Sequence, residues 1–199
     1  FAWFLSRAAS HRRPLLLMIV IIPFWTSSLI RTYALVILMK ANGIINTVLA
    51  AAGLITEPLS LLYTDAAVYV GLVYSLLPFM ILPLYAVLEK MDIRLMEAAR
   101  DLGANSFQVF VHVVLPLSLP GVMAGCIMVF LPAMGLFYIP DLLGGAKTML
   151  VGNFIKNQFL TAGNWPFGSA ASVFLLLLMV VMLGIYFFVS TRFSRSRES

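Results

Sequence analysis

The sequence predicts an all-α fold, a transmembrane helical bundle that crosses the membrane several times. Of the 199 residues, 62% are hydrophobic and 11% are charged, whereas soluble domains are about 45–50% apolar and roughly 25% charged. Four segments also stay apolar over the roughly 20 residues that a helix needs to cross a bilayer. We therefore expect residues 1–199 to form a single transmembrane domain.

The predicted spans follow one another at short intervals along the chain. The opening FAWFLSR resembles the end of a spanning helix and has no initiator Met, so we expect the domain to be incomplete at its N-terminus. The four full spans are predicted at 14–36, 66–88, 117–139 and 168–190. Prolines interrupt three of them, at Pro23, Pro78, Pro83, Pro120 and Pro132. Membrane bundles tolerate such prolines because neighbouring helices, hydroxyl groups or water satisfy the freed carbonyls.

The basic residues between the spans predict the orientation of the chain. One side carries nine of them, Arg7, Arg12, Arg13, Lys90, Arg94, Arg100, Arg192, Arg195 and Arg197. The other side carries four, Arg31, Lys40, Lys147 and Lys156. Because cytoplasmic loops carry an excess of Lys and Arg, the first side and the C-terminus are predicted to be cytoplasmic. Segments 40–65 and 140–166 then face outward.

Other features of the sequence argue against several functions. The basic residues behind the net charge of +5 are scattered between apolar runs, so we expect no nucleic-acid partner. Cys126 is the only cysteine, and His11 and His112 lack metal-ligand spacing, so we expect neither a disulfide nor a metal site. The glycine-rich LLGGAKT lacks the spacing of a G-x-x-x-x-G-K-[ST] phosphate loop. We therefore expect no catalytic residue and no nucleotide site in this chain.

The charged segment 97–121, EAARDLGANSFQVFVHVVLPLSLPG, interrupts the apolar sequence. Gly103 suits the position after a helix, where a positive φ costs glycine little, and Asn105 or Ser106 can cap a second short helix. Pro116 is expected to end that second helix. The apolar residues before the glycine have the spacing of a short amphipathic helix: Ile93, Leu95, Met96, Ala99 and Leu102. The segment is thus either a helix–turn–helix knob that transmits a push from a cytoplasmic partner, or an amphipathic loop lying on the lipid surface.

The spacing within this segment resembles the EAA motif of ABC importer permeases, EAA-x3-G-x9-I-x-LP. The matching residues are Glu97, Ala98, Ala99, Gly103, Leu115 and Pro116, and the one departure is Val113 in place of Ile. In that family the loop, here residues 90–116, is a cytoplasmic coupling loop that docks into a groove on a separate ATPase subunit. The resemblance implies that the six matching residues form this ATPase contact.

Longer segments carry a closer resemblance. RPLLLMIVIIPFWTSSLIRTYAL, GLVYSLLPFMILPLYAVLEKMD, PAMGLFYIPDLLGGAK and NWPFGSAAS are similar to the B-type permeases of bacterial spermidine/putrescine ABC importers. The resemblance implies a type I ABC importer permease fold in the bacterial inner membrane. It also implies a second, unlike permease, an ATPase dimer that binds ATP and Mg, and a periplasmic substrate-binding protein. Such permeases usually have six spans, so this chain would lack the first span, the first outer loop and most of the second span.

A polyamine cargo needs carboxylates for its ammonium groups and aromatic faces for cation–π contact. Asp141 is the first candidate, because it lies at the outer end of a predicted span directly after Phe137 and Tyr138. It is alternatively a helix-end or turn residue in water. Further aromatic residues either line the path or mark the membrane interface: Trp25, Tyr33, Tyr74 and Tyr85. Residues that contact either the cargo or the binding protein are Glu57, Asp65 and Trp165.

Arg31 is the exception among these candidates, since a cation at the outer mouth repels a polyamine unless it is paired, with Asp141 or with Asp65.

Three other functions remain open on sequence grounds. They are an importer permease for another small solute, a self-sufficient channel or secondary transporter, and an intramembrane enzyme. The span interiors hold no ionisable groups of the kind that secondary transporters use, and no nucleophile with a base is visible.

Overall fold

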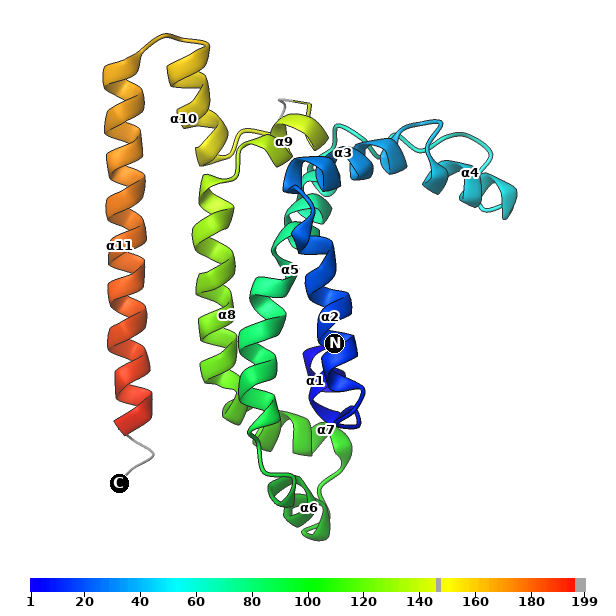
Figure 1. The fold of residues 1–199 in the computed structure, drawn as a ribbon, viewed down its shortest axis with the longest axis vertical. Coiled ribbons are helices and arrows are strands. Elements are labelled where there is room, and N and C mark those ends of the chain that lie inside the picture. Colours follow the sequence, from blue (N-terminus) through cyan, green and yellow to red (C-terminus); the bar gives the residue numbers. More distant parts are fainter. Residues whose placement is uncertain (146–147, 196–199) are drawn as a thin grey trace. The chain divides into compact units, whose positions relative to one another are not determined.

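The described secondary structure is entirely helical in the computed structural model (Figure 1). The structure describes residues 1–145 and 148–195, and side chains as far as residue 188. Lys147 and Arg197, and the side chains of Arg192 and Arg195, therefore lie outside the described part. Within that part, the prediction of an all-α fold is confirmed.

The chain divides into two compact units. The first comprises Phe1–Ile21, Leu77–Phe130 and the residues from Met182 onward, and the second comprises Ile22–Leu76 and Leu131–Val181. Three long helices have residues in both units: α5 (Asp65–Glu89), α8 (Leu115–Gly135) and α11 (Trp165–Arg195). That the chain acts as one permease domain stays a prediction.

The first unit holds the charged segment in place. Its shorter elements are α1 (Ala2–Arg7), α2 (Arg13–Ile21), α6 (Arg94–Asp101), α7 (Ser106–Val109) and the π-helical turn η2 (Phe110–Val114). Its buried core consists of Ala2, Leu5, Val20, Ile81, Tyr85, Leu88, Met96, Val109 and Val114. Met96 is the buried residue of α6 in this core, and the half-buried Ala99 packs against it, so these two side chains hold α6 on the first unit.

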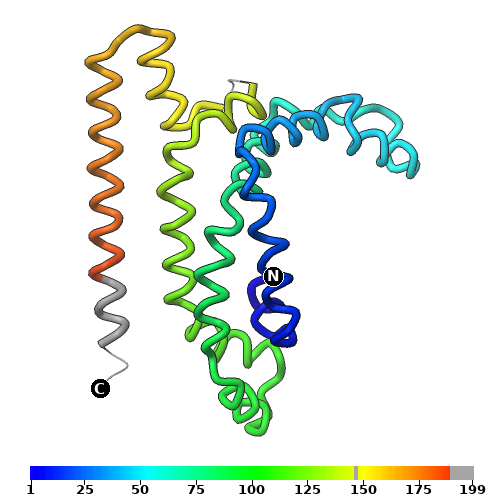
Figure 2. The backbone as a smooth tube through the Cα atoms, viewed as in Figure 1, coloured from blue at the N-terminus to red at the C-terminus, as the bar shows by residue number. Residues whose placement is uncertain are grey.

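The second unit holds Asp141 and its neighbours. Its shorter elements are η1 (Ile22–Trp25), α3 (Ser28–Met39), α4 (Ile44–Ala51), α9 (Tyr138–Leu143) and α10 (Val151–Leu160). Its buried core consists of Met39, Ala67, Val68, Ile139 and Leu143. Figure 2 shows α10 and the start of α11 running side by side in opposite directions. Two edge-to-face ring pairs join them, Phe154 with Phe167 at 5.9 Å and Phe159 with Trp165 at 5.6 Å between ring centroids.

Two of the predicted spans are confirmed as continuous helices. Span 66–88 corresponds to α5, which stays helical through Pro78 and Pro83, and span 168–190 lies within α11. By length and composition, the described residues contain four stretches that could cross a membrane: Ser28–Ala51, Asp65–Glu89, Ser106–Gly135 and Trp165–Phe188. The chain is therefore a multi-pass membrane protein.

The predicted span 14–36 is wrong as one helix. Helix α2 ends at Ile21, η1 follows, and α3 begins only at Ser28. Pro23 has no amide to donate to a helical turn, and the Thr26 hydroxyl donates to the Pro23 carbonyl at 2.7 Å. Local bonds of this kind compete with the helix, so the segment 22–27 breaks it.

The expected helix end at Pro116 is also wrong. The chain stays helical from Ser106 through Gly135, and the five residues before Leu115 form the π-turn η2. The Leu115 amide donates to the Phe110 carbonyl, five residues back. This wider turn shifts the hydrogen-bond register just before the proline, which is how helices accommodate a residue without an amide hydrogen.

The third predicted span, 117–139, is shifted for a related reason. Its helix begins well before Leu117, because Pro116 does not interrupt it, and it ends at Gly135 rather than at Ile139. Phe137 caps the separate short helix α9. The outer end of this span is therefore a break between α8 and α9, and Asp141 lies on α9 rather than at the end of the span.

Candidate functional site

The loop 90–116, called the coupling loop below after the motif that it resembles, contains a hydrogen-bonded turn between two helices. At the end of α6, the Gly103 amide donates to the Arg100 carbonyl at 2.8 Å, and the Ala104 amide donates to the Ala99 carbonyl at 3.0 Å. This pair of bonds is the Schellman motif, which requires a left-handed residue after the helix. Gly103 has φ +86°, so the predicted positive φ is confirmed.

A capping box begins the second helix of the loop. The Asn105 side chain accepts from the Gln108 amide at 2.8 Å, and the Gln108 side chain accepts from the Asn105 amide at 2.8 Å. Of the two predicted caps, the structure therefore selects Asn105. The two motifs together satisfy several of the backbone groups left without partners at the end of α6 and at the start of α7.

The exposed side of the loop carries the motif residues. Glu97, Ala98 and Gly103 are exposed, Ala99 is half-buried, and Leu115 and Pro116 are exposed on the first turn of α8. Leu102 is 90% exposed and Phe107 is 74% exposed, although both are strongly apolar. A hollow of about 330 Å³ lies between α6 and the following helix, lined by Ala99, Leu102, Gly103, Ala104, Gln108, Val109, His112 and Val113. The loop thus presents apolar surface and a hollow, as a docking surface for another protein does.

Arg7 ties the start of the chain to the coupling loop, a role that the sequence analysis missed. Its guanidinium lies over the Trp3 ring at 4.6 Å, and its Nη2 donates to the Met96 sulfur on α6 at 3.4 Å. The sequence around Arg7 does not predict this contact, because Met96 lies 89 residues further along the chain.

We expect removal of the capping box to loosen the second helix of the loop. Asn105→Ala should lower the stability of that helix by about 0.5–2 kcal/mol, the usual cost of losing such a cap. Hydrogen exchange of the amides of residues 106–114 measures this, and their protection should fall. Ser106→Ala is the matched control, because Asn105 is the residue that accepts the capping hydrogen bond. Equal protection in the two variants would contradict the expectation.

Asp141 lies in a cluster of polar side chains on α9 and α10. Its carboxylate accepts from Asn153 Nδ2 and forms an ion pair with Lys156 Nζ. The two side chains of the pair are 24% and 30% exposed, so the pair is partly shielded from solvent. Asn153 and Lys156 are three residues apart on α10, which places them on one face of that helix.

Two further features make this cluster suited to an alkylammonium group. The ammonium of Lys156 lies 5.8 Å from the centroid of the Phe137 ring, within cation–π range. Asn153 Nδ2 donates to the Phe137 carbonyl at 2.8 Å as well as to Asp141, so its amide oxygen points elsewhere. That oxygen is buried and has no hydrogen-bond partner among the described residues. The cluster thus offers a carboxylate, a ring face and a spare acceptor.

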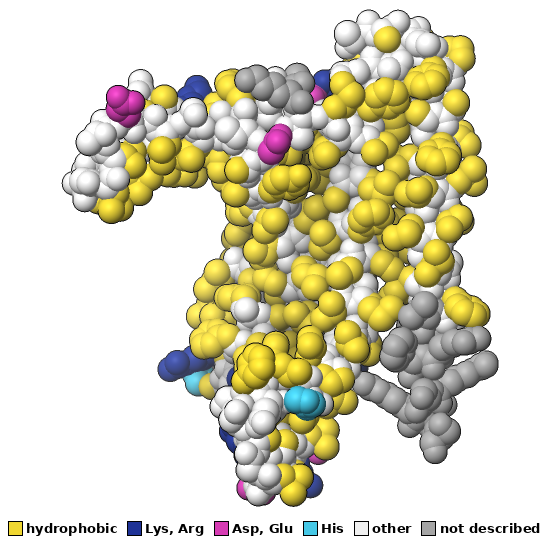
Figure 3. Space-filling view, turned by 180° about the vertical axis from the view of Figure 1, so that it is seen from behind, with side chains coloured by type: hydrophobic (Ala, Val, Ile, Leu, Met, Phe, Trp, Pro, Cys, Tyr) yellow, Lys and Arg dark blue, Asp and Glu magenta, His cyan; other side chains and the backbone are white. Residues whose placement is uncertain are grey.

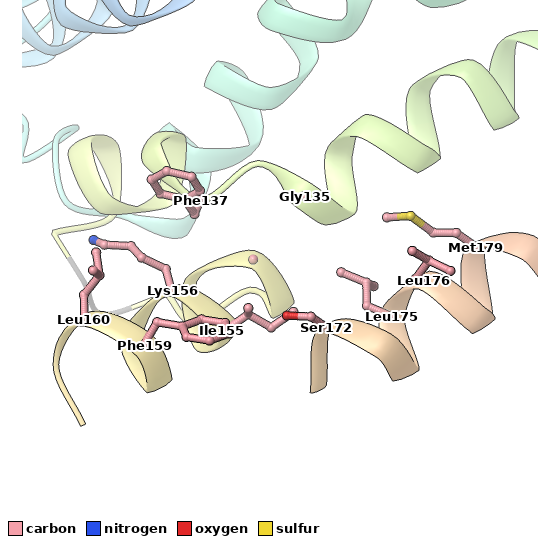
Figure 4. A pocket seen from close by; sticks show the side chains of 11 residues that line it. Gly135, Phe137, Ile155, Lys156, Phe159, Leu160, Ser172, Leu175, Leu176 and Met179 are labelled. Atoms are coloured by element: carbon pink, nitrogen blue, oxygen red, sulfur yellow. The ribbon is translucent and has the colours of Figure 1, made fainter. Parts of the chain in front are cut away.

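An open hollow of about 510 Å³ adjoins the cluster (Figure 4). Phe137 and Lys156 lie on one side of it, and Ser172, Leu175 and Met179 of α11 lie on another. Its remaining lining residues are Gly135, Gly152, Ile155, Phe159, Leu160 and Leu176. The hollow thus reaches the cluster through Phe137 and Lys156, the partner of Asp141, and its other walls are largely apolar.

The expected pairing of Arg31 with Asp141 or Asp65 is wrong. Asp141 is paired with Lys156, and Asp65 accepts from the Thr148 hydroxyl. The Arg31 guanidinium instead lies over the rings of Phe24 and Tyr74, at 4.1 and 5.8 Å. Stacking on aromatic faces suits the planar guanidinium, and both acids have other partners.

The other candidate residues are spread over both units. Trp25 and Tyr33 are exposed on or beside α3, Tyr74 contacts Arg31, and Tyr138 packs its ring edge against Phe137 at 6.1 Å. Tyr85 is buried in the core of the first unit. Glu57 is exposed in the loop after α4, and Trp165 is exposed at the start of α11. The structure thus brings Asp141, Phe137 and Tyr138 together in the second unit, whereas Tyr85 belongs to the first.

A multi-pass helical protein whose exposed loop carries EAA-like spacing has the features of a transporter permease. This chain is a member of the family of binding-protein-dependent transport system inner membrane components, whose family model matches residues 3–195.

Individual relatives extend this assignment. The chain is 54% identical over 198 residues to the spermidine/putrescine transport system permease protein PotB of Haemophilus influenzae, covering 100% of this chain and 69% of that protein. It is 50% identical to PotB of Escherichia coli K12, covering 100% of this chain and 72% of that protein.

A solved structure supports the fold. A bacterial alginate ABC transporter, crystallised with an alginate pentasaccharide-bound periplasmic protein, superposes with a TM-score of 0.74 over 96% of this chain and 70% of that chain. The sequence identity is 19%, so this likeness concerns the fold alone. The chain therefore has the fold of an ABC importer permease.

Proposed function

We propose that this chain is one of two unlike permease subunits of an ATP-driven importer of polyamines. The observation that carries the proposal is its identity of at least 50%, along the whole chain, to the PotB permeases of two bacteria. Their names give spermidine and putrescine as the cargo. The chain forms half of the translocation pathway, in the bacterial inner membrane.

The coupling loop is proposed to dock on a separate ATPase subunit. A docking helix must keep a fixed angle while it is pushed, and the Schellman motif at Gly103 and the capping box at Asn105 provide this stiffness. Met96 anchors α6 on the core of the first unit, so a displacement of α6 is passed to α5. ATP and Mg are bound by that ATPase and not by this chain.

The orientation follows from the coupling loop and the basic residues. The loop and the C-terminus lie in the cytoplasm, and segments 40–65 and 140–166 face the periplasm. A substrate-binding protein docks on these outer segments, with contacts at Glu57, Asp65 and Trp165. The Asp65 carboxylate already joins the two segments through its hydrogen bond from Thr148.

The cluster around Asp141 is proposed to receive an ammonium group of the cargo. A polyamine is an aliphatic chain with terminal ammonium groups, and the lysine side chain has the same composition on a smaller scale. The contacts of the Lys156 ammonium with Asp141 and Phe137 support this proposal by analogy. The adjoining hollow gives the methylene groups of a cargo apolar neighbours.

A purified complex tests this proposal. We expect one copy of this chain with one copy of a different permease and two ATPase subunits, and ATP-dependent uptake of radiolabelled spermidine into proteoliposomes when a binding protein is supplied. A complex with two copies of this chain and no other permease would disprove the unlike pair. Uptake of another solute in place of spermidine and putrescine would disprove the cargo assignment.

A further inference from the structure

The segment Ser28–Ala51, called the arm below, is apolar enough to be counted among the possible spans. It is nevertheless two helices, α3 of 12 residues and α4 of 8 residues. At 1.5 Å per residue these are about 18 and 12 Å long, and the hydrocarbon core of a bilayer is about 30 Å thick. Neither helix can cross it alone.

The turn between the two helices makes a crossing still less favourable. It carries Lys40 and Asn42, both exposed, at the midpoint of the arm. If the arm were a span, Lys40 would lie at the bilayer centre, where a lysine costs about 2.5–3.5 kcal/mol even on the most permissive scale.

The bend of the arm is held by specific hydrogen bonds. The buried side chain of Asn46 donates to the carbonyls of Lys40 and Leu59 at 3.3 and 2.9 Å, and it accepts from the Leu59 amide at 3.0 Å. At Gly43, a Cβ would collide with the Leu38 carbonyl. The arm therefore cannot straighten into one helix without leaving a buried amide unsatisfied, which is costly.

The arm also runs in a different direction from the spans of its own unit. Within the second unit, α3 and α4 run across the direction of α11 (Figure 1). Helix α11 is long enough to span the bilayer. With α11 placed across the bilayer, the arm would run close to the plane of the membrane.

One face of the arm is apolar and exposed. Its members recur at helical spacing along both helices: Leu29, Ile30, Tyr33, Ile37, Ile44 and Val48. Figure 3 shows hydrophobic side chains along one edge of the arm. The arm has two charged residues, Arg31, which stacks on Phe24 and Tyr74, and Lys40, which is exposed in the turn. Trp25, just before the arm, is 85% exposed, and Trp and Tyr are enriched at membrane–water interfaces.

From these observations we propose that the arm is an interfacial helix pair that lies in the outer leaflet of the membrane. Its apolar face contacts the acyl chains, and the turn with Lys40 and Asn42 faces the water, as the polar side of an amphipathic helix does at a membrane surface. The exposed apolar residues Tyr69, Val70 and Val73 at the start of α5 continue this lipid contact onto a span. Only the choice of the outer leaflet rests on the orientation proposed above.

Fluorescence quenching tests the depth of the arm in the assembled complex. In a Cys126→Ser background, single cysteines Ile37→Cys and Val48→Cys on the apolar face are labelled with an environment-sensitive fluorophore. Ala41→Cys in the turn is the aqueous control and Leu177→Cys on α11 is the deep control. The labelled complexes are placed in nanodiscs whose lipids carry a nitroxide either near the headgroup or near the end of the acyl chain.

We expect the Ile37 and Val48 labels to be quenched at least about twofold more by the shallow nitroxide than by the deep one, because an interfacial helix lies about 5–10 Å into the headgroup boundary. The Leu177 label should show the reverse, and the Ala41 label should be quenched by aqueous iodide. Deep quenching at Ala41 would show that the arm spans the bilayer. No lipid quenching at Ile37 and Val48 would show that another protein covers the face. Either result overturns the proposal, and Ile30→Cys replaces any variant that fails to assemble.

Discussion

Gly103→Val is expected to abolish most transport while the complex still inserts into the membrane. Gly103 adopts φ +86° in the Schellman turn after α6, and a left-handed conformation costs a residue with a Cβ roughly 1–2 kcal/mol. A β-branched side chain adds to this cost. Because 1.4 kcal/mol is a tenfold change in a population, the coupling helix should be misplaced in most molecules, and spermidine uptake and ATPase association should fall about tenfold or more.

The structure offers a matched control for this variant. Gly163 also has a positive φ, and neither Gly103 nor Gly163 has an atom near the position of an added Cβ. Gly163→Val therefore carries the same backbone cost in the turn before α11, outside the coupling loop. It should leave ATPase association, measured by co-purification, unchanged. Normal uptake by Gly103→Val at normal expression, or equal loss of the ATPase from both variants, would disprove the coupling role.

Asp141→Asn is expected to reduce polyamine uptake about tenfold with the complex still assembled. The substitution keeps the shape of the side chain and removes its charge. At a partly wet site with an effective dielectric of about 20, a pair at about 4 Å is worth roughly 4 kcal/mol before desolvation. The net gain is on the order of 1–2 kcal/mol, which corresponds to about a tenfold change in affinity. A stronger site would hinder the release of cargo.

The pairing of Asp141 with Lys156 defines a competing explanation, in which the carboxylate only joins α9 to α10. Under that explanation, Asp141→Asn and Lys156→Met should lower the melting temperature of the complex alike and leave uptake per assembled complex unchanged. Under the cargo explanation, Lys156→Met leaves the carboxylate available, so uptake should persist in this variant and fall only in Asp141→Asn. An unchanged normalised uptake in Asp141→Asn would remove Asp141 from the cargo path.

Local sequence rules predicted the coupling loop well. The positive φ of Gly103 and the cap at Asn105 both follow from contacts between residues within five positions of each other. The spans 66–88 and 168–190 were predictable because an unbroken apolar run has few alternatives in a membrane. The same rules failed at Pro116, where the π-turn η2 absorbs the proline, and at 14–36, where hydropathy alone does not detect a break.

The sequence by itself determined the membrane class, the position of the coupling loop and the turn chemistry that shapes it, because these depend on composition and on neighbours along the chain. Only the tertiary structure decided the partners of the charged residues. Asp141 was expected to receive the cargo, to be a helix-end residue in water or to pair with Arg31. It pairs with Lys156 and Asn153, while Arg31 stacks on Phe24 and Tyr74. The physical reason is that an ion pair forms only between groups that the fold brings within a few ångströms of each other. The packing of α9 against α10, which brings Asp141 to Lys156, cannot be predicted from the residues that neighbour either one along the chain.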